Sequence, residues 1–261
     1  MTASPPTRLL RSVRDFRRRF QELAPGDLLL GLLPLRPGEQ VKLLDLALRG
    51  VVLFPSALAQ LLSRSKVAQA EILKEFMLPA TFVAYGLPDL TAQAPHFHTQ
   101  QAVVSKRDQA HLGQGVSLWP SLEALHSLGA LRGLPFPLVI QPFLDNARDL
   151  RVVVMGDYVE AYERVNPHGF RKNIFQGGSS RPVHLGPQEH DFCRRVMARG
   201  QFPYAILDVL VSPDGLPYLS EISLKGGLTG SRLGQAGFRE QVKRLEEEFH
   251  HTWADSLTTP D

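Results

Sequence analysis

Residues 205–228 read AILDVLVSPDGLPYLSEISLKGGL, two apolar runs on either side of a Pro-Asp-Gly sequence at 213–215. That pattern is typical of two antiparallel strands joined by a tight turn. The hairpin would bring Asp208 and Glu221 together on one face. Adjacent carboxylates repel unless a cation lies between them, and hard oxygen ligands suit Mg²⁺, which also takes phosphate oxygens. The alternative is two exposed charges on a solvated hairpin, but an acid inside an apolar run requires a partner.

A second group of polar residues precedes this hairpin. Arg151 follows Asp149 in one apolar strand, and Arg164 ends the next strand, after a Gly-Asp turn. Arg171 and Asn173 follow in the loop before a double glycine. Three guanidinium groups near a carboxylate pair suit the binding of several anionic oxygens and of charge that develops on them. Ordinary surface arginines are the alternative that the sequence leaves open.

A third group lies nearer the N-terminus. Lys106 closes the apolar strand 101–106, and Gly113 and Gly115 lie in the turn before the return strand 116–119. An ammonium group and exposed backbone N–H groups at such a turn suit phosphate. A solvated lysine at a strand end is the alternative. The glycines form neither a Walker motif nor a dinucleotide-binding G-x-G-x-x-G after a strand.

The order of predicted elements indicates an α+β fold, with a small α/β lobe followed by a larger, sheet-rich one. In the predicted helix 38–48, Val41, Leu44 and Leu48 mark the face that is expected to be buried. Residues 88–98 read as a linker. The predicted strands are 27–33, 51–54, 81–85, 101–106, 116–119, 138–142, 149–155, 158–165, 205–211 and 218–222, and the predicted helices are 38–48, 57–62, 65–76, 121–128, 188–199 and 238–250.

Composition excludes several classes of protein. Of the 261 residues, 43% are apolar and 21% charged, which is ordinary for a globular chain and supplies a sizeable core. No apolar run reaches the roughly 18 residues of a membrane span. Cys193 is the one cysteine, so an internal disulfide and a cysteine-based zinc site are excluded.

The positive charge is concentrated at the N-terminus. Residues 1–20 carry six arginines and one aspartate, a balance of +5, against +3 for the whole chain. We expect a solvated amphipathic helix with disordered leading residues; a transit peptide and a segment that binds an anionic partner are the alternatives. A basic patch on the folded body is not indicated, so we expect no nucleic-acid partner. Without a secretory or membrane segment, the cytoplasm is the expected location.

Taken in order, these segments resemble one family, the ATP-grasp proteins, nearest the RimK-type ribosomal-protein glutamate ligases and bacterial glutathione synthetases. The resemblance covers roughly residues 50–235 and begins at the helix entry Ser65-Lys66. Its strongest parts are the Asp-x-Arg strand at 149–151, the stretch 164–178 and the pair Asp208 and Glu221. Each part alone is unspecific, but their order and spacing together are family-like.

The resemblance implies two α+β subdomains that clasp ATP, preceded by a shortened N-terminal α/β lobe. We accordingly expect an arm at 1–24, the short lobe at 25–85, a lid subdomain at 86–136, a C-terminal subdomain at 137–255 and a tail at 256–261. The loop 108–115 would close over the phosphates. The residues implied in nucleotide binding are Lys66, Lys106, Gly113, Gly115, Gln141, Pro142, Phe143, Leu144 and Asp149.

The resemblance also implies a metal site and an activity. Asp208, Glu221 and Ser223 would hold Mg²⁺, or Mn²⁺ in its place, and four residues would steer the γ-phosphate or an acyl phosphate: Arg151, Arg164, Arg171 and Asn173. The implied reaction is ATP-dependent ligation of a carboxylate to an amine or a thiol through an acyl-phosphate intermediate. Small molecules or peptides would supply both groups. A degenerate nucleotide-binding module without turnover and an ATP-grasp kinase are the alternatives.

The sequence departs from the family pattern at three points. The family usually has asparagine where this chain has Ser223, a shorter and poorer metal ligand, which puts a second metal ion in question. Arg107 stands where proline is common. The N-terminal lobe is short, so the sequence does not identify the substrates. Oligomeric state is left open as well.

Overall fold

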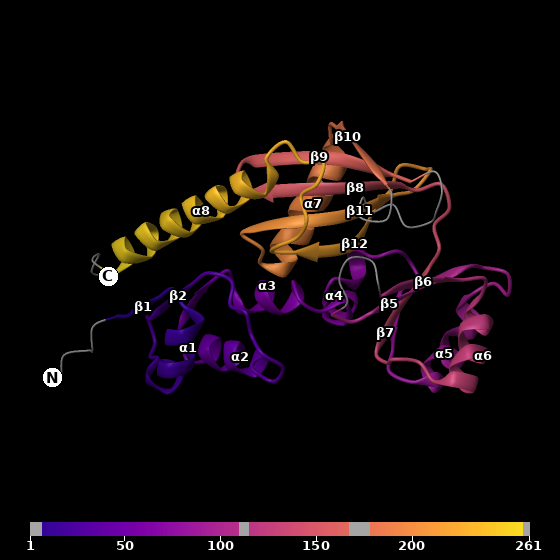
Figure 1. The fold of residues 1–261 in the computed structure, drawn as a ribbon, viewed down its shortest axis with the longest axis horizontal. Helices are drawn as coiled ribbons and strands as arrows, with labels where there is room; N and C mark the ends of the chain where they lie inside the picture. The colour runs from indigo at the N-terminus through magenta and orange to yellow at the C-terminus, as the bar shows by residue number, and fades with distance from the viewer. Residues whose placement is uncertain (1–6, 110–114, 167–177, 258–261) are drawn as a thin grey trace.

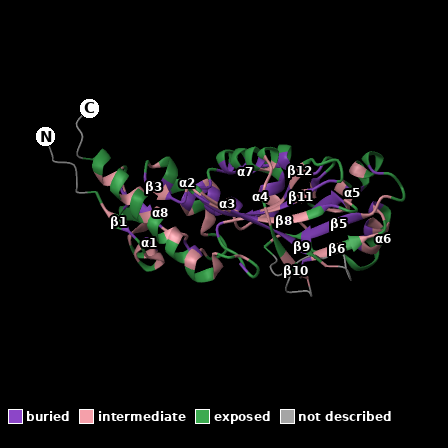
Figure 2. Ribbon diagram, turned by 90° about the horizontal axis from the view of Figure 1, so that it is seen from above, coloured by how far each residue is buried: buried purple, intermediate pink, exposed green. Residues whose placement is uncertain are grey.

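The computed structural model describes residues 7–109, 115–166 and 178–257, which form three sheets (Figure 1). Three hydrophobic clusters accompany these sheets, and buried residues follow the strands in Figure 2. The mixture of parallel and antiparallel sheets with covering helices makes this an α+β protein, as the element order predicts. Among the described helices, none has both the length and the apolarity needed to cross a membrane.

The first lobe is a parallel sheet in the order β1-β2-β3 with two helices. Each short strand is apolar, and the side chains of β2 are all buried. The lobe's elements are β1 (Leu9–Leu10), α1 (Val13–Arg19), η1 (Phe20–Glu22), β2 (Leu28–Leu30), α2 (Gln40–Leu48) and β3 (Val52–Phe54).

The N-terminal segment differs from the solvated arm that its charge suggests. Leu9–Leu10 pairs with β2, and α1 is indeed amphipathic, but its Phe16 is completely buried in the lobe's core. Arg17 is held by Glu39, the residue before α2, with Nη2 and Oε2 at 2.8 Å. The prediction of a solvated arm rested on net charge, which takes no account of these few apolar residues. Their burial provides enough apolar contact to hold the segment against the first lobe.

The buried face of α2 is also not the predicted one. Val41, Leu44 and Leu48 are 64%, 49% and 89% exposed, whereas Leu43 and Leu46 are completely buried. Both sets recur at helical spacing, so periodicity alone allows either face to turn inward. Packing against the rest of the lobe selects the second set.

The second sheet has the order β4-β7-β5-β6 and is antiparallel throughout. The helices α5 and α6 pack on it at the end of the molecule opposite to the first lobe (Figure 1). Its elements are β4 (Phe82–Ala84), α5 (Leu87–Gln93), η3 (Ala94–His96), β5 (Val103–Arg107), β6 (Val116–Trp119), α6 (Leu122–Arg132) and β7 (Leu138–Pro142).

Two expectations about this sheet need correction. Strand β4 pairs with β7 in the second sheet. Strand β4 therefore does not belong to the first lobe, and β7 does not belong to the large sheet, although their places in the chain suggest those positions. A three-residue strand carries too little information to specify a partner more than 50 residues away. The expected linker 88–98 contains α5, because Pro88 occupies the first turn of the helix and Asp89 caps its start. Proline is favourable at that position rather than a helix breaker.

The third and largest sheet is antiparallel in the order β10-β9-β8-β11-β12. Its side chains and those of α7 form most of the main hydrophobic cluster, to which β2 and β3 of the first lobe also contribute. Strand β10 was not among the predicted strands, because its Ser-Ser-Arg-Pro-Val sequence lacks an apolar run. The elements are β8 (Arg148–Met155), β9 (Tyr158–Val165), β10 (Ser179–Val183), α7 (Pro187–Gly200), β11 (Tyr204–Val211), β12 (Pro217–Ser223) and α8 (Gly234–Ser256).

Helices α3 (Ala57–Leu62) and α4 (Lys66–Ile72), followed by η2 (Lys74–Phe76), lie between the sheets. Ser56 caps α3, as its position after Pro55 predicts, and Ser65, the first residue of the predicted helix 65–76, caps α4; each accepts a hydrogen bond from a backbone N–H group. Helix α8 runs from the large sheet back to the first lobe (Figure 1). There Trp253 Nε1 donates to the carbonyl of Gly26 at 3.1 Å, so the last helix connects the large sheet to the first lobe.

Candidate functional site

The two acidic residues of the 205–228 hairpin are direct cross-strand partners. Asp208 on β11 pairs with Glu221 on β12, and the register shifts immediately after Asp208. Directly paired residues of an antiparallel sheet project from the same face. The hairpin therefore places both carboxylates on one face, as its sequence predicts.

Two arginines bind Asp208. Arg151 is its cross-strand partner on β8, with Nε 2.7 Å from Oδ1 and Nη2 2.9 Å from Oδ2. Arg164 reaches the same carboxylate with Nη2 3.2 Å from Oδ2, while its Nε donates to Asp149 Oδ1 at 2.9 Å. Burial by itself would raise the pKa of Asp208, but the two guanidinium groups outweigh it and hold that pKa well below its usual range. The carboxylate is therefore ionised and fully paired.

Two buried lysines converge on β12 from different parts of the chain. Lys66 begins α4, and its Nζ lies 3.0 Å from Glu221 Oε1. Lys106 lies on β5 of the second sheet, and its Nζ donates to the carbonyl and to Oγ of Ser220, both at 3.0 Å. Desolvation lowers the pKa of Lys106 to about 8, although the negative charge of Glu221 opposes this shift. The site thus combines residues from both sheets and from the helix between them.

The start of α4 is joined to the second sheet by Asp108, which follows β5. Its Oδ2 accepts a hydrogen bond from Ser65 Oγ at 3.1 Å, and its Oδ1 accepts one from Val67 N at 3.2 Å. A carboxylate at a helix N-terminus also interacts favourably with the helix dipole. Sequence reasoning counted Asp108 only as the beginning of a loop. It identified the loop but not the contact, since the contact joins residues more than 40 positions apart.

The remaining predicted site residues that the structure describes lie on or next to β6, β7 and β12. Gln141 and Pro142 are buried at the end of β7, and Phe143 N donates to the carbonyl of Ala102 at 2.8 Å, with the partly buried Leu144 next in the chain. Gly115 accepts from Arg107 N at 2.8 Å. Ser223 ends β12, and its Oγ donates to the carbonyl of Lys225 at 2.7 Å. Three predicted residues lie outside the described ranges: Gly113, Arg171 and Asn173.

Sequence reasoning missed Tyr162, which is the cross-strand partner of Arg151 on β9. The side chain is 1% exposed, and within the described part of the chain its hydroxyl has no hydrogen-bond partner. Burial raises the pKa of this phenol. Strand alternation could have identified it, because Tyr162 and Arg164 lie two positions apart and thus on the same face.

A metal ion in this cluster would draw on few protein ligands. Among residues 7–109, 115–166 and 178–257, no group of three or more His, Cys, Asp or Glu side chains is arranged to hold an ion. Two paired carboxylates nevertheless match Mg²⁺, which is commonly bound by one or two carboxylates and completed by water and phosphate oxygens. The donor set therefore fits Mg²⁺ in company with a phosphate ligand.

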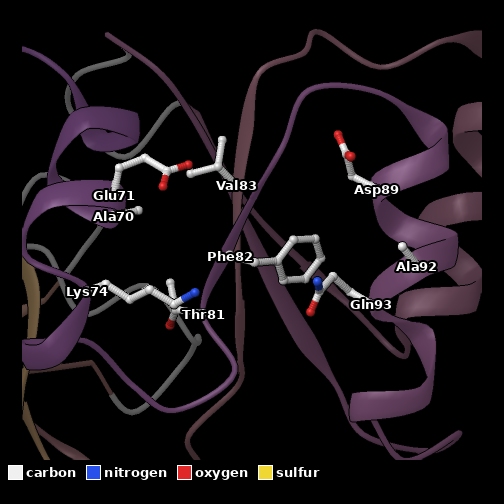
Figure 3. A pocket seen from close by; sticks show the side chains of 9 residues that line it. All are labelled: Ala70, Glu71, Lys74, Thr81, Phe82, Val83, Asp89, Ala92 and Gln93. Atoms are coloured by element: carbon white, nitrogen blue, oxygen red, sulfur yellow. The ribbon is translucent and has the colours of Figure 1, made fainter.

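A separate cavity of about 200 Å³ lies between α4, β4 and α5 (Figure 3). None of its lining residues was a predicted site residue, and the charged cluster contributes no side chain to it. The lining consists of Ala70, Glu71, Lys74, Thr81, Phe82, Val83, Asp89, Ala92 and Gln93.

Comparisons with known proteins concern the sequence and the fold. Residues 58–236 match the model of the RimK-like ATP-grasp domain. A relative from Nitrosococcus oceani, named probable alpha-L-glutamate ligase, is 30% identical over 188 residues, which are 69% of this chain and 62% of that protein. One of the same name from Picosynechococcus sp. is 32% identical over 181 residues, 64% of this chain and 58% of the other. The chain thus spans about 60% of the length of these relatives.

Solved structures share the fold at low sequence identity. D-cycloserine synthetase DcsG superposes with a TM-score of 0.58 at 11% identity, covering 92% of this chain and 99% of that one. The ADP complex of N5-carboxyaminoimidazole ribonucleotide synthetase gives a TM-score of 0.60 at 11% identity, covering 87% and 63%. D-alanyl-alanine synthetase A from Vibrio cholerae gives 0.57 at 14%, covering 89% and 77%. At these identities the likeness concerns the fold alone.

Proposed function

The chain belongs to the RimK-like ATP-grasp family, and from that membership together with the charged cluster we propose that it is an ATP- and Mg²⁺-dependent carboxylate–amine ligase. The names of its relatives make L-glutamate the first candidate for the amine substrate. The observation that carries the proposal is the row of paired side chains across three strands: Glu221 beside Asp208, and Asp208 beside Arg151.

The charged cluster around this row supplies both kinds of group that a bound triphosphate requires, cationic side chains and carboxylates that can hold a metal ion. Lys66, Lys106, Arg151 and Arg164 offer four cationic side chains to phosphate oxygens, and the two arginines are suited to bidentate contacts. The pKa of Lys106, about 8, lies above neutral pH, so Lys106 can bind phosphate as an ammonium ion at pH 7. Gln141 to Leu144 lie at the end of β7, where their backbone can meet a nucleotide base.

Mg²⁺ would be held by Asp208 and Glu221, with Ser223 as a further oxygen donor, and would neutralise charge on the phosphate oxygens. Mn²⁺, which also accepts oxygen ligands, would serve in its place. The protein's own contribution is otherwise positioning and electrostatic stabilisation, which is how most phosphoryl transfer is catalysed.

In the first chemical step, a carboxylate oxygen of the substrate attacks the γ-phosphorus of ATP, and ADP leaves. Arg151 and Arg164 orient the transferred group and balance the negative charge on its oxygens. In the second step, the amine nitrogen attacks the carbonyl carbon of the acyl phosphate, inorganic phosphate leaves and the nitrogen loses a proton. The side chains of the site hold the reactants in place and exclude water from the acyl phosphate.

A nucleotide-binding module without turnover is the second candidate, and Ser223 favours it. A serine stands at the family's asparagine position, and its hydroxyl hydrogen is engaged with the carbonyl of Lys225 at 2.7 Å. A module of this kind would bind ATP and ADP but release no ADP from ATP with any acceptor.

The test is ADP formation from ATP in the presence of Mg²⁺, screened against L-glutamate, other amino acids and short peptides, with product mass read in parallel. Ligation predicts ADP, phosphate and an amide product in equal amounts. ADP with a phosphorylated acceptor would indicate a kinase, and nucleotide binding without ADP release would indicate the inactive module. Glu221→Gln should abolish ADP formation; unchanged turnover would remove Glu221 from the mechanism.

A further inference from the structure

Both oxygens of Asp208 are already occupied in this structure. Arg151 takes both of them in a fork, at 2.7 and 2.9 Å, and Arg164 adds a third contact at 3.2 Å. Glu221 likewise has its Oε1 bound by Lys66 at 3.0 Å. The side chains of Asp208 and Arg164 are largely shielded from solvent, at 14% and 8% exposed, so water screens the contact between them little, whereas Glu221 is 37% exposed.

A free divalent ion would meet two obstacles at this place. It would have to displace a guanidinium group from Asp208, because that carboxylate has no oxygen without a cationic partner. It would also enter among the positive charges of the arginines and of Lys66, and like charges repel strongly in a poorly solvated site. A cation that arrives without an accompanying anion therefore gains little from this carboxylate pair.

Phosphate oxygens change this balance, since they offer guanidinium groups an equivalent bidentate partner. Each arginine also has a second anchor: Arg151 Nη1 donates to the carbonyl of Gly227 at 2.8 Å, and Arg164 Nε donates to Asp149 at 2.9 Å. An arginine can therefore turn from Asp208 toward a phosphate while remaining attached to the protein. The contact from Arg164 to Asp208 is the longest of the three and requires the smallest change.

We infer that Arg151 and Arg164 are specificity-determining residues that block Asp208 against a free divalent cation and release it only when a phosphate ligand binds. The site then selects the metal–nucleotide pair over the bare ion. This inference rests on the proposed nucleotide and metal site, and adds that the arginines set the order in which its ligands can be accommodated. It concerns equilibrium binding, so it is measurable without turnover.

The experiment measures Mn²⁺ binding to the nucleotide-free protein from the loss of the free-ion electron paramagnetic resonance signal. We expect Arg164→Gln to bind Mn²⁺ about tenfold more tightly than the parent, a size typical of coupling between sites. Arg164→Lys keeps the positive charge without the guanidinium group, and its affinity should lie between those of the parent and Arg164→Gln. Arg181→Gln is the matched control, because it removes an arginine from Glu163 on the same sheet; it should bind Mn²⁺ like the parent.

Circular dichroism establishes that each variant is folded, and Arg151→Gln supplies a second, independent removal. Adding Asp208→Asn to Arg164→Gln should abolish the gain. The inference is overturned if the parent protein binds Mn²⁺ without nucleotide as tightly as Arg164→Gln does, or if Arg181→Gln shows the same gain.

A second arm adds ADP at saturation, with the formation of the Mn²⁺–ADP complex subtracted from a protein-free titration. The parent should then bind Mn²⁺ about tenfold more tightly than without ADP. If ADP binds to neither the parent nor any variant, the proposed nucleotide site fails, while the nucleotide-free comparison still decides the role of the arginines. The two failures are therefore distinguishable.

Discussion

Replacing Gln69 by leucine tests how the fold fixes the helix that carries Lys66. Gln69 is buried on α4, and its amide behaves like one residue of an additional strand beside β12, which is an edge strand of the large sheet. Its Nε2 donates to the carbonyl of Ile222 at 2.8 Å, and its Oε1 accepts from Ile222 N at 3.0 Å. Nε2 also donates to the carbonyl of Leu62 at 2.7 Å, so a single side chain joins α3, α4 and β12.

Leucine has a similar volume but can form none of these hydrogen bonds. The carbonyl of Leu62 keeps a bond from Ser65 N at 3.3 Å, whereas the buried N–H and carbonyl of Ile222 lose their partner. An unsatisfied buried polar group costs roughly 1–3 kcal/mol, so we expect the free energy of unfolding to fall by about 3 kcal/mol. That is a large fraction of the total for a typical domain.

The measurement is urea unfolding followed by far-ultraviolet circular dichroism. Equal m values for the parent and the variant would establish that both expose the same amount of surface on unfolding. Glu71→Ala, on the exposed side of the same helix, is the matched control and should alter the free energy by no more than about 0.5 kcal/mol. A loss below about 1 kcal/mol for Gln69→Leu would refute the argument that this amide fixes α4 to the sheet.

Three further predictions follow from the site and the first lobe. Asp208→Asn should abolish Mg²⁺-dependent ADP formation with the far-ultraviolet spectrum unchanged, whereas Asp157→Asn, in the exposed turn between β8 and β9, should retain activity; equal activities would exclude a metal role for Asp208. The lowered pKa of Lys106, about 8, means that this lysine loses its proton as the pH rises through that value. The affinity for ADP, measured by calorimetry, should therefore fall between pH 7 and 9, by close to tenfold per pH unit at the upper end. Lys106→Arg should remove this pH dependence. In urea titrations, Leu43→Ala should lower the free energy of unfolding by about 2–5 kcal/mol and Leu44→Ala by less than about 0.5 kcal/mol. The reverse order would mean that α2 buries the face with Leu44, as the sequence predicts.

The sequence predicted those features that depend on neighbours in the chain. The sequence predicts helix caps at Ser56 and Ser121, and each accepts the expected backbone hydrogen bond. The hairpin at 205–223 was read from its turn and its apolar runs, and its register pairs Asp208 with Glu221. Caps and tight turns are set by interactions within a few residues, so a single sequence contains the information that they require.

Other features were decided only when distant segments packed together. The sequence suggests arginines near a carboxylate pair, but only the structure shows which carboxylates Arg151 and Arg164 bind. It also brings Lys66 and Lys106, which are 40 residues apart, to the adjacent residues Glu221 and Ser220 of β12. It also determined the sheet to which β4 belongs and the buried face of α2. A short strand can pair with several partners and a helix with apolar residues on two sides can turn either inward, so the choice falls to whichever arrangement buries the most apolar surface while pairing every buried polar group.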